Sequence, residues 1–149
     1  MNHKFLQPDW YEHVRTLMEW RDDWLLGRET QYPVVLHDLE RYVQELNVRL
    51  RPIEIVSVLL CWVMHRQSED GTFPMARQDV ASIAETVVGQ QFDNMRHADI
   101  VGRAVIEKLK RLNIIDFATS CATTETSVRR DGKKWMYRWS FDRSEPKLQ

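Results

Sequence analysis

Four cations lie within six residues in the C-terminal part of the chain. An Asp131-Gly132 pair indicates a tight hairpin turn at this point. The cations that flank it are Arg129, Arg130, Lys133 and Lys134. Lys and Arg at an exposed loop tip can neutralise phosphate groups, in contacts that are independent of sequence and weaken as salt rises. Charged hairpin tips also keep proteins soluble without binding anything, so both interpretations are open for this loop.

Charge is distributed unevenly along the chain. The 149 residues carry a formal net charge of −1. Residues 1–96 hold 10 Lys or Arg against 15 Asp or Glu, a charge of −5, and residues 97–149 hold 11 against 7, a charge of +4. A basic part that meets phosphate, joined to an acidic part that meets protein, would give this distribution. An uneven but solvated surface would give it as well.

The residues that usually carry catalysis or bind metals are not grouped. Neither Cys-x-x-Cys nor His-x-x-x-His occurs, and the five histidines are scattered. There is no glycine-rich loop followed by Lys and Ser or Thr, and the Asp22-Asp23 pair falls in a hydrophilic stretch where we expect it to be solvated. Cys61 and Cys121 are expected to be buried, reduced thiols. We therefore expect a protein that is not an enzyme and that uses no cofactor or metal.

The spacing of apolar residues predicts five helices. The first two, over residues 8–26 and about 33–46, each have one apolar stripe. The third begins near Pro52 and is apolar on nearly every side, so it should be the most buried. The fourth covers about residues 76–88 and ends at Gly89, which can adopt the left-handed conformation. The fifth covers about residues 97–112, with one apolar face and one free face.

The sequence also predicts three extended segments, one before the fourth helix and two after the fifth. Thr72-Phe73 is a very short one, placed after an Asp70-Gly71 turn. Residues 114–121 are rich in β-branched and aromatic side chains. Residues 134–141 alternate, with four aromatic side chains on one face: Trp135, Tyr137, Trp139 and Phe141. We expect the last two segments to pair across the basic loop.

The order of elements from Pro52 onward resembles the winged helix-turn-helix superfamily, over roughly 90 residues. Residues 73–84 (FPMARQDVASIA) look like the start of the positioning helix, and residues 105–115 (VIEKLKRLNII) like the end of the recognition helix as it enters the wing. The implied fold is mainly α with a small β-hairpin: a winged helix domain at 51–143, preceded by two helices in residues 1–50 and followed by a flexible tail at 144–149. The sequence departs from the pattern at Ala76, where a Ser or Thr cap is more typical.

Members of this superfamily commonly insert the recognition helix into the major groove of double-stranded DNA and lay the wing along the backbone or minor groove. Many regulate transcription or initiate replication of plasmids and phages. By this resemblance, base edges would be read by long polar side chains near the start of the helix: Asn94, Arg96, His97 and Arg103. Phosphates would be met by cations further along it and in the wing: Lys108, Lys110, Arg111, Arg129, Arg130, Lys133 and Lys134. An ordinary solvated helix face remains the alternative.

Aromatic residues of the first predicted helix suggest a surface for a partner. Trp20 lies off the main apolar stripe, with Tyr11 and Trp24 nearby. We expect these three to form an exposed patch that binds another protein or a second copy of the chain. A two-fold homodimer would double the basic surface and match a palindromic DNA site. Most of the other tryptophans are expected in the core, and stacking on unpaired bases is disfavoured.

Two functions therefore remain open. One is a DNA-binding protein, either a sequence-specific regulator or a replication or maintenance factor. The other is a non-catalytic protein-interaction subunit of a larger DNA-processing complex, which the low net charge favours. No apolar run approaches the roughly 18 to 20 residues that cross a membrane. Residues 1–10 lack the features of a secretory signal, so we expect a cytoplasmic location.

Overall fold

The structure is a computed structural model, and it describes residues 5–118 and 135–142. The described residues form five helices and three short strands. The helices are α1 (Trp10–Leu25), α2 (Val34–Glu45), α3 (Pro52–Gln67), α4 (Arg77–Val88) and α5 (Met95–Arg111). The strands are β1 (Thr72–Pro74), β2 (Ile115–Phe117) and β3 (Met136–Trp139). The expected mainly helical class is confirmed, and the expected small β-hairpin is present as two strands of a three-stranded antiparallel sheet.

The three strands form one antiparallel sheet in the order β1-β3-β2. Ile115 lies opposite Trp139 and Phe117 opposite Tyr137, so the predicted pairing of the last two extended segments is confirmed. On its other edge β3 pairs with β1, where Phe73 also lies opposite Tyr137. The sequence predicted β1 as an extended piece but not its place in the sheet, because that pairing joins segments more than 60 residues apart.

Buried and exposed side chains alternate along β3, and the buried ones pack the sheet against the core. Trp135 and Tyr137 are buried and Trp139 is half-buried, whereas Arg138 and Ser140 are exposed. Beyond the strand, Phe141 is buried and its ring packs 5.3 Å from that of Tyr42, measured between centroids. The predicted division into an aromatic face and a polar face is therefore confirmed.

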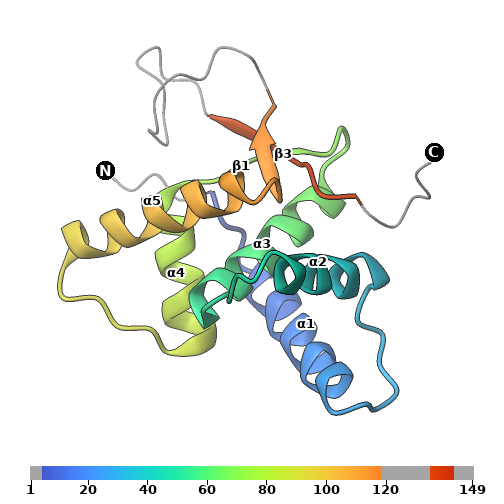
Figure 1. The fold of residues 1–149 in the computed structure, drawn as a ribbon. Helices are drawn as coiled ribbons and strands as arrows, with labels where there is room; N and C mark the ends of the chain where they lie inside the picture. Colours follow the sequence, from blue (N-terminus) through green and yellow to red (C-terminus); the bar gives the residue numbers. More distant parts are fainter. Residues whose placement is uncertain (1–4, 119–134, 143–149) are drawn as a thin grey trace.

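The apolar helix α3 lies at the centre of the molecule (Figure 1). Its residues Val56, Leu60 and Cys61 have no exposed surface, as expected for a helix that is apolar on nearly every side. In the view of Figure 1, α4 and α5 lie on one side of α3, and α1 and α2 lie on the other. One hydrophobic cluster includes buried residues of all five helices, so α1 and α2 share the core of the helices that follow them.

A buried carboxylate in the first turn of α4 accepts a hydrogen bond from the residue that precedes the helix. Asp79 is fully buried, and one of its oxygens accepts a hydrogen bond of 2.8 Å from the backbone N–H of Ala76. Its other oxygen accepts hydrogen bonds from the backbone N–H groups of Phe5 and Leu6, at 2.8 and 3.0 Å. Asp79 therefore satisfies a donor at the helix start that a Ser or Thr at position 76 would not reach, and it also holds residues 5 and 6 against α4.

Candidate nucleic-acid interface

A close helix crossing fixes the position of α5. A Cβ atom added to Gly102 would lie 2.6 Å from the carbonyl oxygen of Arg77, at the start of α4. One turn earlier on α5, the carboxylate of Asp99 accepts a hydrogen bond of 2.9 Å from the guanidinium of Arg77. At the other end of α5, the hydroxyl of Tyr42 on α2 donates to the carbonyl of Leu112, at 3.1 Å. These contacts determine which face of α5 points toward the core and which points away.

The outward face of α5 carries a stripe of arginines. Arg96, Arg103 and Arg111 are exposed, and they recur at spacings of seven and eight residues, which place them on one side of an α-helix. Among the described residues, none of the three has an ion-pair partner. The opposite side of the helix is buried at Gly102, Val105, Ile106 and Leu109. The three guanidinium groups can therefore donate to phosphates or to the edges of bases, with the carboxylate of Glu107 between Arg103 and Arg111 on the same side of the helix.

Two large apolar side chains are exposed near the start of α5: Ile100 on the side of the arginines, and Met95 at the first position of the helix, on the side that Gly102 and Leu109 continue. Met95 is 76% exposed and Ile100 is 57% exposed, and Ile100 lies one turn after Arg96 and one turn before Arg103. Exposed large apolar residues are costly to solvate, and contact with a partner would remove that cost. A thymine methyl group in the major groove is one such partner, and an apolar surface of another protein is a second.

Two of the predicted base-reading residues build the start of α5. Asn94 is the N-cap, and its side-chain oxygen accepts a hydrogen bond of 2.8 Å from the backbone N–H of His97. The Nδ1 atom of His97 accepts one of 3.0 Å from the backbone N–H of Asp93. The helix therefore begins at Met95, two residues before the predicted start. Asn is among the residues most favoured at an N-cap, so the residue type at position 94 is the local signal for this earlier start.

Two of the predicted phosphate-binding lysines are held within the molecule. The Nζ atom of Lys108 lies 2.9 Å from a carboxylate oxygen of Glu54 and 3.4 Å from the carbonyl oxygen of Arg49. The Nζ atom of Lys110 lies 4.1 Å from the centroid of the Phe117 ring and 3.7 Å from a carboxylate oxygen of Glu107. The prediction that these two lysines contact phosphate is not supported by this geometry, because both ammonium groups already have partners.

Glu54 explains why Lys108 is held. Its side chain is 1% exposed, and one of its oxygens also accepts a hydrogen bond of 2.7 Å from the backbone N–H of Arg51. Burial alone would raise the pKa of Glu54, but the hydrogen bonds from Arg51 and Lys108 outweigh it and hold the pKa below its ordinary value. A buried carboxylate needs such partners, so we expect Lys108 to contribute to the stability of the fold.

The predicted basic loop falls between the two described segments. Arg129, Arg130, Lys133 and Lys134 lie outside the described residues. The strands before and after them, β2 and β3, are antiparallel neighbours, with Asp116 opposite Arg138. Cys121 also lies outside the described residues, whereas Cys61 is free and buried, and burial raises the pKa of its thiol.

The expected aromatic patch on α1 is not formed by the three predicted residues. Tyr11, Trp20 and Trp24 are all half-buried and pack against the core. The hydroxyl of Tyr11 is hydrogen-bonded to that of Ser82 on α4, and the ring of Trp24 stacks on His37 with 4.6 Å between centroids. Trp20 lines a cleft of about 240 Å³ together with Trp62. The predicted exposure was wrong because it considered α1 alone, whereas residues of α2, α3 and α4 pack against these rings; the binding of a partner by these residues stays a prediction.

Other large apolar side chains are exposed on the described residues. Besides Met95 and Ile100 they are Leu25, Leu26, Val34 and Leu46. Three of them, Leu25, Leu26 and Val34, lie at the end of α1 and the start of α2.

The described residues contain no group of three or more His, Cys, Asp or Glu side chains that could hold a metal ion. None of the helices in this part of the chain is long and apolar enough to cross a lipid bilayer. Comparisons of the chain with known protein families, curated proteins and solved structures gave no match.

Proposed function

We propose that the chain is a DNA-binding protein of the winged helix-turn-helix class. The order α3, β1, α4, α5, β2, β3 and the strand order β1-β3-β2 support the proposal, as does the basic segment between β2 and β3. In this proposal α4 and α5 form the helix-turn-helix, α5 is the recognition helix, and the segment between β2 and β3 is the wing. The protein would act in the cytoplasm, as a sequence-specific regulator or as a replication or maintenance factor.

The outward stripe of α5 is the observation that carries the proposal. Arg96 and Arg103 would enter the major groove, where a guanidinium can donate two hydrogen bonds to one guanine. Ile100, between them, would contact a thymine methyl group. Arg111, at the other end of the stripe, would bind the backbone. Arg129, Arg130, Lys133 and Lys134 would add phosphate contacts from the wing, and a homodimer on a palindromic site would double all of these contacts.

Fluorescence anisotropy on labelled DNA tests the proposal. A binding site is first selected from random duplexes, and affinity for it is then measured from low to physiological salt. We expect Arg96→Ala and Arg103→Ala each to weaken binding by about tenfold, because a good base contact contributes about 1 to 3 kcal/mol of discrimination. Replacing the four wing cations with Ala should reduce the slope of log affinity against log salt by about 0.9 for each phosphate that the wing no longer neutralises.

Arg41→Ala is the matched control. Arg41 lies on α2, 64% of its side chain is exposed, and its guanidinium is 3.7 Å from the carboxylate of Asp38. Its replacement should leave DNA affinity unchanged, and the free energy of unfolding of all these surface variants should stay within about 0.5 kcal/mol of the wild type. A wild-type protein without measurable affinity for any duplex at low salt would overturn the proposal.

The exposure of Met95 and Ile100 favours a second candidate function. Their apolar surface, next to arginines, is also typical of a protein-binding site, in which the chain would be a non-catalytic subunit of a larger DNA-processing complex. In that case Ile100→Asp would abolish co-purification with a partner, while affinity for DNA would be absent from the start. The same anisotropy titration therefore separates the two functions.

A further inference from the structure

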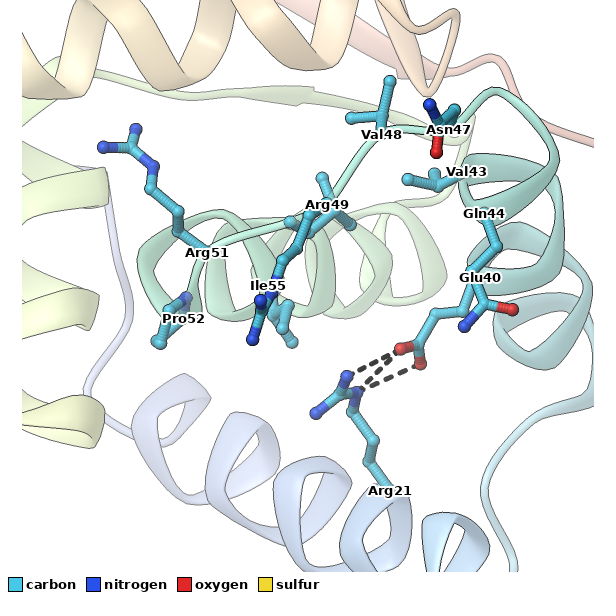
Figure 2. A pocket seen from close by; sticks show the side chains of 11 residues that line it. Arg21, Glu40, Val43, Gln44, Asn47, Val48, Arg49, Arg51, Pro52 and Ile55 are labelled. Carbon is cyan, nitrogen blue, oxygen red and sulfur yellow. Dashed lines mark hydrogen bonds and ion pairs between the residues drawn. The ribbon is translucent and has the colours of Figure 1, made fainter.

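A large pocket lies on a part of the surface that the proposed DNA contacts do not use. Its volume is about 750 Å³, and it is lined by α1, α2, the connection between α2 and α3, and the start of α3. This volume is in the range of sites that bind small molecules. Figure 2 shows the side chains around it: Arg21, Glu40, Val43, Gln44, Asn47, Val48, Arg49, Leu50, Arg51, Pro52 and Ile55.

The lining carries more positive than negative charge. Three of its side chains are arginines, and Glu40 is its one carboxylate. Arg21 donates to both oxygens of Glu40, at 2.7 to 3.1 Å, and the hydroxyl of Tyr32 donates to one of them at 2.8 Å. Glu40 therefore has its acceptors occupied by groups within the protein and is not available to neutralise another cation in the pocket.

Arg51 is likewise occupied, because its guanidinium lies 2.9 Å from a carboxylate oxygen of Glu54. Arg49 differs from the other two arginines. Its side chain is exposed and has no ion-pair or hydrogen-bond partner among the described residues. In Figure 2 it extends from the connection between α2 and α3 toward Ile55. It is thus a cation without an ion-pair partner among the described residues, in a pocket that apolar side chains also line.

We propose that this pocket binds a small organic acid, a molecule with one carboxylate and an apolar body. The carboxylate would accept two hydrogen bonds from the guanidinium of Arg49, a geometry that Arg favours. The apolar body would lie against apolar side chains of the lining, which include Val43, Val48 and Ile55. Gln44 and Asn47, at the end of α2, supply amide groups that can bind further polar atoms of the ligand.

The pocket is physically connected to α5. The carbonyl oxygen of Arg49 accepts a hydrogen bond from Lys108, and Lys108 also contacts Glu54, which holds Arg51. If a bound acid moves Arg49, it would therefore act on Lys108, the residue of α5 that contacts the connection between α2 and α3. This second step rests on the proposed function and makes the acid an effector of DNA binding.

Two-dimensional ¹⁵N NMR of the full chain tests the binding step without DNA. The probes are 2-naphthoate and octanoate, with 2-naphthamide as the neutral match of the first. We expect at least one acid to shift the amide signals of residues 43–55 saturably, with a Kd of about 1 mM or below, and the amide to bind at least about tenfold more weakly. Arg49→Gln should weaken acid binding at least about tenfold, since it removes the charge and keeps a polar side chain.

Arg28→Gln is the matched control, because Arg28 is an exposed arginine that lies between α1 and α2 and does not line the pocket. It should bind the acid as the wild type does. The proposal is overturned if neither acid shifts these amide signals, if 2-naphthamide binds as tightly as 2-naphthoate, or if Arg49→Gln binds as tightly as the wild type. It is also overturned if Arg49→Gln changes only DNA affinity, since Arg49 would then be a phosphate contact.

Anisotropy with the selected DNA tests the effector step. The acid should change the DNA affinity of the wild type at least twofold and leave that of Arg49→Gln unchanged. An acid that binds but does not alter DNA affinity rules out the effector step alone, and a protein that binds the acid but no DNA contradicts the proposed function alone.

Discussion

Cations on two sides of α5 differ in what surrounds them. On the outward side, Arg103 is exposed and has no ion-pair partner among the described residues. On the side next to α3, Lys108 is 22% exposed and lies 2.9 Å from the carboxylate of Glu54, which is itself buried. The two cations are only five positions apart in the sequence. Arg103 is a surface residue, whereas Lys108 is paired with a buried carboxylate.

The difference shows that a count of cations on a helix overstates the charge available to a ligand. Seven residues in and before α5 were predicted to contact DNA, and four of them already have partners within the molecule: Asn94, His97, Lys108 and Lys110. The arginines Arg96, Arg103 and Arg111 remain. Removing a cation should therefore affect binding on one side of the helix and stability on the other.

Gly102→Ala should have the largest effect, because it disturbs the crossing that sets the two sides apart. The new Cβ would lie 2.6 Å from a backbone oxygen of Arg77, so α4 and α5 would have to separate. We expect the free energy of unfolding to fall by about 3 kcal/mol, the upper end of the usual cost of overpacking. Chemical denaturation measures it. Helix propensity alone would favour Ala over Gly by about 1 kcal/mol, so a stabilised variant would contradict the crossing.

Lys108→Ala should have the next largest effect. It leaves the buried carboxylate of Glu54 with one charged partner fewer, and we expect the free energy of unfolding to fall by about 2 kcal/mol. DNA affinity of the folded variant should keep the wild-type dependence on salt. Arg111→Ala on the exposed side is the matched control, with unfolding within about 0.5 kcal/mol of the wild type. If Lys108→Ala instead flattened the salt dependence at unchanged stability, the distinction between the two sides would fail.

Lowering the pH should produce the smallest change in the free energy of unfolding, and that change should depend on Glu54. The hydrogen bonds of Glu54 hold its pKa below the ordinary 4.5. A carboxylate with a lowered pKa in the folded state stabilises the protein above its unfolded-state pKa, and this contribution is lost as the pH falls through the folded-state pKa. Glu54→Gln should therefore be less stable than the wild type at neutral pH, with a gap that narrows below pH 4.5. Denaturation from neutral to acidic pH measures the gap, and a constant gap would contradict this assignment.

The helices and the pairing of the last two strands followed from local patterns. Apolar spacing within one helix, and alternation within β3, are set by residues that are close in the sequence. Pro52 and Gly89 marked a helix start and a helix end as predicted: Pro52 is the first residue of α3, and Gly89 has a φ of 70° at the end of α4.

The roles of individual side chains depended on contacts that no local pattern contains. Lys108 meets Glu54 across 54 positions of sequence, and Tyr11 meets Ser82 across 71. Each partner looks solvated when its own helix is considered alone. The pocket between α2 and α3 was missed for the same reason, since Arg21 and Arg49 come from different elements and are brought to one cavity only by the packing of α1 against α3.

The hydrogen bonds of Asp79 link the proposed helix-turn-helix to residues near the start of the chain. Residues 5 and 6 donate to the same carboxylate that satisfies the start of α4, 73 and 74 positions away in the sequence. Cutting or displacing these residues would leave the buried carboxyl group of Asp79 without two of its donors, in the first turn of α4, the helix against which α5 packs. An engineered fusion near Phe5 is therefore expected to destabilise the start of α4, where Arg77 packs against Gly102 of α5, although these residues are remote from Phe5 in the chain.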